Sequence, residues 1–303
     1  MSENKETIIN WYPGHMAKAK RQMQEDMKII DVVVELVDAR IPYSSKNPDI
    51  DALAGGKSRV LLLNKADLAD PDVTALWKSL YESRGFTVAA IDSRRGNGLK
   101  IVENCILEAC REKIERDRRR GIVNRPLRAM IVGIPNVGKS TFINSFAGKA
   151  VAKTGDKPGV TKGKQWIRLN KTVELLDTPG ILWPKFESPE VGRRIAWIGS
   201  VNDRILVTTE MAEGLLVFLT ERYAGLVGAY YGIDEDTAGC DVPGAELLQR
   251  IAVRRGCIRK GGEVDLERAA NLVSEDFKSV KIGRVSLEKP SDIPGDVKDR
   301  RKS

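Results

Sequence analysis

The 303-residue chain has few of the features from which disulfide scaffolds, metal centres and membrane proteins are built. Its four cysteines (Cys105, Cys110, Cys240 and Cys257) show no C-x-x-C or other metal-binding spacing, which favours reduced thiols that pack in the interior. No apolar run reaches the length of a transmembrane helix, and residues 1–11 have no signal-peptide core and are not rich in arginine. We therefore expect a cytoplasmic protein that does not enter a membrane.

Histidine is almost absent, since His15 is the only one. Pro13-Gly14 marks a turn before it, and residues 16–29 have helix-forming composition with one apolar face. His15 is therefore predicted to lie at a helix entrance. A lone histidine there is more often a capping or surface residue than a catalyst, and spacing alone leaves both roles open.

Basic residues outnumber acidic ones: the chain has 50 Lys and Arg and 42 Asp and Glu, which gives a net charge of +8. A basic surface favours a polyanionic partner that comes within about 8 Å at physiological salt, although an ordinary solvated surface explains the same balance. With 42% hydrophobic residues the chain can bury a sizeable core, and its length suggests two domains.

Residues 133–140 read GIPNVGKS and fit the pattern G-x-x-x-x-G-K-[ST] of a phosphate-binding loop. The apolar residues 129–132 predict a strand before the loop, and the apolar positions of 142–146 predict a helix after it, which Gly148 ends. Glycines let backbone N–H groups surround phosphate oxygens, while lysine reaches the β and γ phosphates and serine offers a hydroxyl to Mg²⁺. The predicted nucleotide-binding residues here are Asn136, Val137, Gly138, Lys139, Ser140 and Thr141.

A second motif selects the base. Asn64-Lys65-Ala66-Asp67 follows an apolar strand and matches N-K-x-D. The Asp67 carboxylate can accept from guanine N1–H and N2–H₂, donors that adenine lacks, so adenine would leave the acid unpaired. Lys65 can lay its stem against the base, and Asn64 can tie this loop to the phosphate loop. The tetrapeptide alone is a weak signal, but together with the phosphate loop it predicts guanine nucleotide.

Three further segments complete the predicted site. A strand at 86–91 leads to Ser93, and a hairpin at 164–176 delivers the sequence Asp177-Thr178-Pro179-Gly180. Asp177 can hold Mg²⁺ through water, and the Gly180 N–H can meet a γ-phosphate. Thr161, in a polar segment at 157–161, is the candidate second hydroxyl ligand of Mg²⁺ once the nucleotide orders its loop.

Near-continuous apolar runs at 31–38, 59–63 and 86–91 predict buried parallel strands separated by helices, and a helix is predicted from Leu99 to about Arg116. The fold class is therefore α/β, with a doubly wound, mostly parallel sheet. Beyond about residue 191 the pattern becomes helical, with helices predicted at 203–223, 244–255 and 265–281. The predicted domains are 1–190, which holds the nucleotide site, an all-helical 191–288, and a disordered tail at 289–303.

The motifs resemble those of small GTPases related to translation factors, but 64–67 and Ser93 precede the phosphate loop instead of following it. The chain thus resembles a circularly permuted GTPase domain. The opening residues 11–18, WYPGHMAK, and the C-terminal segment make it similar to the RbgA/YlqF family of ribosome biogenesis GTPases, over nearly the whole chain to about residue 285.

The resemblance implies a GTP hydrolase that assists late assembly of the large ribosomal subunit, bound as GTP and released on hydrolysis. Ile181 stands where many G proteins carry a water-orienting glutamine, and the family places that role on a leader histidine, here His15. Asn136 matches the phosphate-loop asparagine of potassium-activated GTPases, which implies K⁺ beside GTP or GDP and Mg²⁺. The implied catalytic set is His15, Lys139, Thr161 and Gly180.

The implied partner is a large-subunit precursor with its ribosomal RNA and proteins, and no DNA. A candidate phosphate-backbone surface is basic and lacks interleaved aromatics, which favours folded RNA; its members are Arg250, Arg254, Arg255, Arg259 and Lys260. The basic cluster at 111–120 is explained equally by a helix C-terminus or by RNA contact. Two alternatives stay open: a GTPase of the small subunit or another structured RNA, and a non-catalytic scaffold that senses guanine nucleotide.

Overall fold

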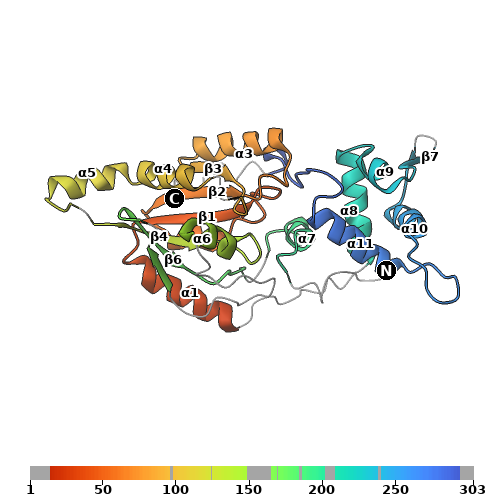
Figure 1. Cartoon of the computed structure of the whole chain (residues 1–303), viewed down its shortest axis with the longest axis horizontal. Helices are drawn as coiled ribbons and strands as arrows, with labels where there is room; N and C mark the ends of the chain where they lie inside the picture. The colour runs from red at the N-terminus through yellow and green to blue at the C-terminus, as the bar shows by residue number, and fades with distance from the viewer. Residues whose placement is uncertain are drawn as a thin grey trace, which may run out of the picture.

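The computed structural model of the chain describes residues 14–95, 98–123, 125–148, 165–168, 170–183, 186–201, 209–237 and 240–293. A sheet with its helices forms one end of the molecule, and a group of helices from the C-terminal third forms the other (Figure 1). Within the described residues, none of the helices combines the length and the apolar character that crossing a bilayer requires.

The sheet has six strands in the order β3-β2-β1-β4-β6-β5. All neighbouring pairs are parallel except β5 with β6, which form the predicted hairpin. The prediction of a mostly parallel α/β sheet is confirmed. The strands are β1 (Val32–Asp38), β2 (Ser58–Asn64), β3 (Thr87–Ile91), β4 (Leu127–Val132), β5 (Gln165–Arg168) and β6 (Val173–Asp177).

Helices cover both faces of the sheet, as alternate residues of β2 show. Leu61 and Leu63 pack with Trp77 of α3 (Pro71–Ser83), whereas Val60 and Leu62 belong to the cluster that holds α4 (Leu99–Ala109). Successive strand side chains point to opposite faces, so α3 and α4 lie on opposite sides. The sheet is therefore doubly wound. Two further helices, α1 (Gly14–Met27) and α6 (Lys139–Ala147), contribute to the larger cluster, and the short α2 (Pro48–Leu53) contacts α1.

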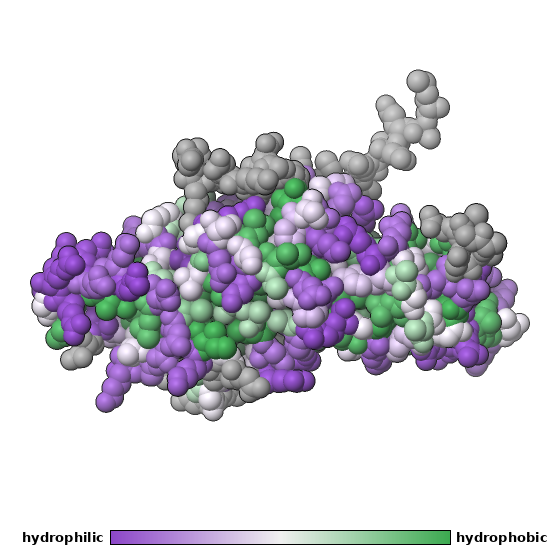
Figure 2. Space-filling model, turned by 90° about the horizontal axis from the view of Figure 1, so that it is seen from above, coloured by the Kyte–Doolittle hydropathy of each residue, from purple (hydrophilic) through white to green (hydrophobic). Residues whose placement is uncertain are grey.

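The helix predicted from Leu99 to Arg116 is wrong as a single element. It divides at Cys110 into α4 and α5 (Arg111–Arg119). The division follows burial, because α4 buries Val102 and Ile106 against the sheet while α5 has no buried side chain and projects past the sheet. In Figure 2 the end of the molecule that α5 forms is hydrophilic. Its last turn carries Arg116, Arg118 and Arg119, which the C-terminal end of the helix dipole favours.

The C-terminal unit is helical, as predicted. Its helices are α7 (Pro189–Trp197), α8 (Thr209–Arg222), α9 (Leu226–Tyr231), α10 (Gly244–Arg254) and α11 (Leu266–Lys278), with a short hairpin of β7 (Asp236–Thr237) and β8 (Cys240–Asp241). The helix predicted at 203–223 is described from Thr209 onward. A Cβ at Gly244 would lie 2.6 Å from the Glu213 carbonyl oxygen, so glycine allows α10 to approach α8 closely.

The segment 284–293 returns from the helical unit to the sheet. Val285 N–H donates to the Leu68 carbonyl (3.2 Å), Leu287 N–H to the Arg40 carbonyl (2.8 Å), and Trp77 Nε1 to the Glu288 carbonyl (3.0 Å). Pro290–Asp292 then forms the 3₁₀ helix η2. The predicted disordered tail is therefore wrong for residues 289–293, because the Asp292 N–H donates to the Lys289 carbonyl (3.0 Å), the Asp292 carboxylate pairs with Arg222 of α8 (2.9 Å), and Ile293 packs in the cluster that holds Trp77. Residues 294–303 lie outside the described part.

Glu288 joins the two units. Its buried carboxylate accepts from the Tyr43 N–H, the Ser44 N–H (3.0 Å), the Ser44 hydroxyl (2.5 Å) and Arg194 of α7 (3.3 Å). Burial raises the pKa of Glu288, while these donors and the arginine lower it. Helix α7, the returning segment and the loop after β1 thus meet at a single side chain.

Candidate nucleotide-binding site

The carboxyl ends of the parallel strands bring the predicted motifs to one edge of the sheet. Asp38 at the end of β1 is in register with Asn64 at the end of β2, and Asn64 with Ile91 at the end of β3. On the other side of β1, Ile131 of β4 is in register with Asp177 of β6. Ligands of open α/β sheets bind at this edge.

The phosphate loop joins β4 to α6 and needs its glycines. Gly133 and Gly138 have φ values of 152° and 96°, and a Cβ at Gly138 would lie 2.5 Å from Asn64 Nδ2. Lys139 is the first residue of α6 and is buried, and its Nζ donates to the carbonyls of Gly133 and Ile134, both at 3.0 Å. Ser140 and Thr141 follow in the first helical turn, which is a favourable place for phosphate.

Burial lowers the pKa of Lys139 to about 8, although the nearby Asp177 carboxylate acts in the opposite direction. Phosphate binds the protonated amine. We therefore expect GDP affinity to be constant below pH 8 and to fall by up to about tenfold for each unit above it, because binding must then take up a proton. GDP titrations from pH 7 to 9, with calorimetry in two buffers to count the protons, measure this.

Guanosine is the control for that pH profile, because it shares the ionisation of the base but has no phosphate for Lys139. Its affinity should not follow the fall expected for GDP above pH 8. Parallel profiles for guanosine and GDP would assign the pH dependence to another group.

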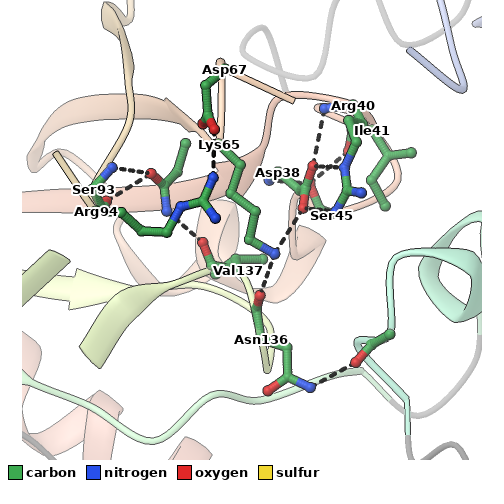
Figure 3. A network of polar contacts seen from close by, with 12 residues as sticks. Asp38, Arg40, Ile41, Ser45, Lys65, Asp67, Ser93, Arg94, Asn136 and Val137 are labelled. Carbon is green, nitrogen blue, oxygen red and sulfur yellow. Dashed lines mark hydrogen bonds and ion pairs between the residues drawn. The ribbon is translucent and has the colours of Figure 1, made fainter. Parts of the chain in front are cut away.

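Asn64 ties the base loop to the phosphate loop, as predicted; its partners Ser93 and Val137 are labelled in Figure 3. Its Nδ2 donates to the Val137 carbonyl (2.7 Å), and its Oδ1 accepts from the Ser93 hydroxyl (2.7 Å) and the Ser93 N–H (3.2 Å). One amide side chain therefore fixes three of the predicted segments. Asn64 is 1% exposed, so its hydrogen bonds connect these segments in the interior of the protein. Contact with the base is then left to the residues next to Asn64.

Lys65 is fixed by residues that the sequence reasoning missed. Its backbone has φ 59°, and its Nζ donates to the Asn136 carbonyl (2.7 Å) and pairs with Asp38 (3.1 Å). Asp38 is held by Arg40 through Nε (2.9 Å) and Nη2 (2.8 Å). Burial raises the pKa of Asp38, but Arg40 and Lys65 outweigh it and hold that pKa well below its usual value. The only indication of these contacts in the sequence is that charged residues stand at the end of a buried strand.

Asp67 has one oxygen available for a base. Its Oδ2 accepts from Arg94 Nη2 (2.5 Å), whereas its Oδ1 is buried without a hydrogen-bond partner among the residues that the structure describes. A buried, unsatisfied carboxylate oxygen is costly in the free protein and suits the N–H donors of guanine. The predicted guanine contact therefore fits. Arg94, which the sequence reasoning did not select, orients this carboxylate.

The Mg²⁺ ligands are only partly described. Asp177 ends β6 and is 3% exposed, and Ser140 is the second residue of α6, while Thr161 lies outside the described residues. The described part of the chain holds no group of three or more His, Cys, Asp or Glu arranged for a metal. His15 is the second residue of α1, as expected for a helix entrance, but its side chain is not described.

Gly180 lies against the phosphate loop, where a Cβ would be 2.6 Å from Lys139 Nζ and 2.9 Å from Pro135 N. This places its backbone beside the lysine, as the predicted γ-phosphate contact requires. Ile181 is 2% exposed and packs in the core, so it does not orient water. Its carbonyl accepts from Asn47 Nδ2 (3.2 Å).

A cavity of about 420 Å³ lies among these loops and also touches the helical unit. Asn136 and Gly199 both line it, and Asn136 Nδ2 donates to the Gly199 carbonyl (2.6 Å). The lining residues from the motifs include Asn64, Lys65, Ser93, Asn136, Gly138 and Thr141, and those from the helical unit are Ile198, Gly199, Val201 and Lys278. A larger cavity, about 650 Å³, lies near Asp31 and Lys113 and contains none of the motif residues.

The sheet order, the phosphate loop after β4 and the guanine loop after β2 define a P-loop GTPase with a circularly permuted G domain. Residues 128–225 match the family model described as 50S ribosome-binding GTPase. The chain is 48% identical to the ribosome biogenesis GTPase A of Priestia megaterium, over 94% of this chain and 98% of that protein. It belongs to the ribosome biogenesis GTPase A family.

More distant relatives agree with this assignment. Ribosome biogenesis GTPase A of Thermotoga maritima is 34% identical, over 94% of this chain and 96% of that protein. The crystal structure of GNP-bound YlqF from T. maritima is 30% identical and aligns with a TM-score of 0.63, covering 91% of this chain and all of that one. The likeness therefore includes the helical unit as well as the G domain.

Proposed function

We propose that this GTPase binds a precursor of the large ribosomal subunit in its GTP state and leaves when GTP is hydrolysed. The observation that carries the proposal is a cavity among the predicted nucleotide motifs that is lined by both the G domain and the helical unit. Nucleotide state can thereby act on both units at once. The names of the relatives and the 50S ribosome-binding family model support a ribosomal partner.

In this proposal Lys139 binds the β and γ phosphates, the Gly180 N–H meets the γ-phosphate, and the Asp67 carboxylate reads the base. Ser140, Thr161 and Asp177 would hold Mg²⁺, which supplies charge neutralisation at the phosphates when bound. We propose the division into 1–190 and 191–288 as functional domains, and a location in the cytoplasm. Residues 284–288 belong to the second by sequence but pack on the first.

The five residues proposed to bind RNA on the helical unit differ in their exposure and in the residues that they contact. Arg250 pairs with Glu246, and Arg259 lies 3.4 Å from Asp265. Arg254 and Lys260 are exposed. Arg255 lies over Tyr230, 5.0 Å from the ring centroid. No aromatic residue is interleaved with these charges in the sequence, but in three dimensions α9 brings Tyr230 beside the end of α10.

Sedimentation tests the partner. With a non-hydrolysable GTP analogue, the protein should sediment with large-subunit precursors through a sucrose gradient, and with GDP it should remain at the top. Sedimentation with small subunits instead would replace the proposal by the first alternative. The absence of ribosome-dependent phosphate release would favour the non-catalytic scaffold.

Alanine in place of His15 should keep GTP affinity while ribosome-stimulated hydrolysis falls by about 10² to 10⁴-fold, the usual contribution of a residue that handles the attacking water's proton. Phosphate release at saturating large subunits measures it. A variant with unchanged stimulated turnover would remove His15 from the mechanism.

We also propose K⁺ as a second cation, near Asn136. Replacing KCl by NaCl at equal ionic strength should slow hydrolysis, because Na⁺ is a poor substitute in a site formed for the larger ion. Equal rates in the two salts would contradict this role of Asn136.

A further inference from the structure

Helix α5 is a strongly charged element that the proposed function does not use. None of its nine residues is buried, and it projects past the sheet (Figure 1). A helix of that length is marginal in water by itself, and most helices in proteins are stabilised by packing of an apolar face. Packing within the chain therefore does not explain why a helix extends here.

The start of α5 is anchored beside the amino ends of the strands. Lys113 pairs with Asp31, the residue before β1, at 3.3 Å and with Asp117 at 2.9 Å. Arg125, shortly before β4, pairs with the same Asp31 carboxylate (3.1 Å). The nucleotide motifs follow the carboxyl ends of these strands, so α5 and the nucleotide site lie at opposite edges of the sheet.

The other cations of residues 111–120 have no carboxylate partner. Within the described residues, no carboxylate oxygen lies within 4.0 Å of their guanidinium groups. Glu112 and Glu115 stand four positions before Arg116 and Arg119, a spacing that favours ion pairs, yet neither pair forms. These exposed residues, the α5 arginine cluster, are Arg111, Arg116, Arg118, Arg119 and Arg120.

The helix dipole accounts for only part of this charge. It favours cations in the last turn and its effect falls off beyond that turn. Arg111 is the first residue of α5, where the dipole disfavours a cation, and Arg118, Arg119 and Arg120 are consecutive, so that their charges repel one another. A ligand with several negative charges explains the whole cluster, because it removes that repulsion when it binds.

Duplex RNA is the polyanion that these features fit. A guanidinium group can donate two parallel N–H bonds to phosphate oxygens. Residues 111–120 contain no aromatic side chain on which an unpaired base could stack, which favours the backbone of a duplex over a single strand. The cluster by itself requires only a polyanion, and the choice of RNA rests on the proposed function.

We propose that the α5 arginine cluster binds the phosphate backbone of duplex RNA and gives the G domain an RNA contact of its own. This deepens the proposed function, in which the RNA-binding residues belong to the helical unit. Helices α5 and α10 lie at opposite ends of the molecule (Figure 1). The protein then contacts RNA at both ends, with the nucleotide site between them.

Glutamine in place of both Arg118 and Arg119 tests this, because both side chains are exposed and glutamine keeps the helix propensity. Affinity for an RNA duplex of about 20 base pairs should fall by roughly 10- to 50-fold near 0.1 M salt. The slope of log affinity against log salt should lessen by about two, since each phosphate contact contributes about one. Fluorescence anisotropy with the full chain measures both quantities, and GDP affinity should not change.

Lys78→Gln combined with Lys100→Gln is the matched control, because it removes two exposed positive charges from α3 and α4. This variant should keep the affinity and the slope of the unaltered protein. Equal losses in the two double variants would overturn the proposal, since net charge alone would then explain binding. An unchanged slope in the arginine variant, or no duplex binding by the unaltered protein, would also overturn it.

Anionic lipid vesicles are the second probe, because a membrane surface is also a polyanion. If the arginine variant lost binding to vesicles and kept its binding to the duplex, the cluster would belong to a membrane contact and the proposal would be wrong. Duplex binding that depends on the cluster, in a protein that fails to sediment with large-subunit precursors, would support this inference and contradict the proposed function.

Discussion

Asparagine in place of Asp67 is expected to weaken GDP and GTP binding by between about 10² and 10⁴-fold, since two charge-assisted hydrogen bonds of about 1.5–3 kcal/mol each would be lost. The Oδ1 atom of Asp67 is buried without a partner among the described residues, and Oδ2 is held by Arg94. The guanine N–H groups would therefore satisfy an oxygen that otherwise remains unpaired. Fluorescence titration with labelled GDP measures the loss.

The same variant should gain affinity for xanthosine diphosphate, because xanthine carries a carbonyl where guanine has an amino group and an asparagine amide can donate to it. Asp72→Asn, five residues away in the exposed first turn of α3, should leave both affinities unchanged. If Asp67→Asn bound GDP normally, or lost both nucleotides equally, Asp67 would not be the base-reading residue.

Alanine in place of Gly180 is expected to slow GTP hydrolysis by about 10² to 10³-fold, the usual cost of removing one preorganised donor to a developing charge. Its Cβ would lie 2.6 Å from Lys139 Nζ and 2.9 Å and 3.0 Å from N and Cα of Pro135. The lysine end could move, but the proline backbone cannot. The phosphate loop and residue 180 would separate, which displaces the N–H proposed to meet the γ-phosphate.

Single-turnover phosphate release at saturating GTP isolates this effect from binding. Gly55→Ala is the control, because a Cβ there would make only an ordinary contact, 3.8 Å from the Ala52 carbonyl oxygen, and should leave hydrolysis unchanged. Normal turnover in Gly180→Ala would show that the loop tolerates the extra methyl group and that the close approach has no catalytic role.

The sequence correctly predicted those structural elements that are determined by residues close together in the chain. Gly133 and Gly138 adopt positive φ values that disfavour other residues, and the apolar runs of β1, β2 and β4 have the continuous pattern of strands buried on both faces. Asn64 bridges two loops because register places the ends of parallel strands side by side, which follows from the strand assignments.

The local sequence pattern gave a wrong prediction of structure where packing against distant segments decides what a segment does. Residues 99–119 are helix-forming throughout, but only α4 has a sheet to cover, and the chain divides at Cys110. Residues 289–293 look polar and disordered in sequence, yet Arg222 of α8 pairs with the Asp292 carboxylate, and Ile293 packs in the cluster that holds Trp77. Neither partner could be assigned before the fold was known.

The sequence by itself determined the nucleotide, the permuted order of the motifs and the parallel sheet, because each motif and each strand is a short run of residues and their order is read directly along the chain. Only the tertiary structure decided that Arg94 orients Asp67, that Asp38 and Arg40 hold Lys65, and that Lys278 of α11 lines the nucleotide cavity. These contacts depend on how strand ends and the helical unit meet in space, and spacing along the chain contains no record of that geometry.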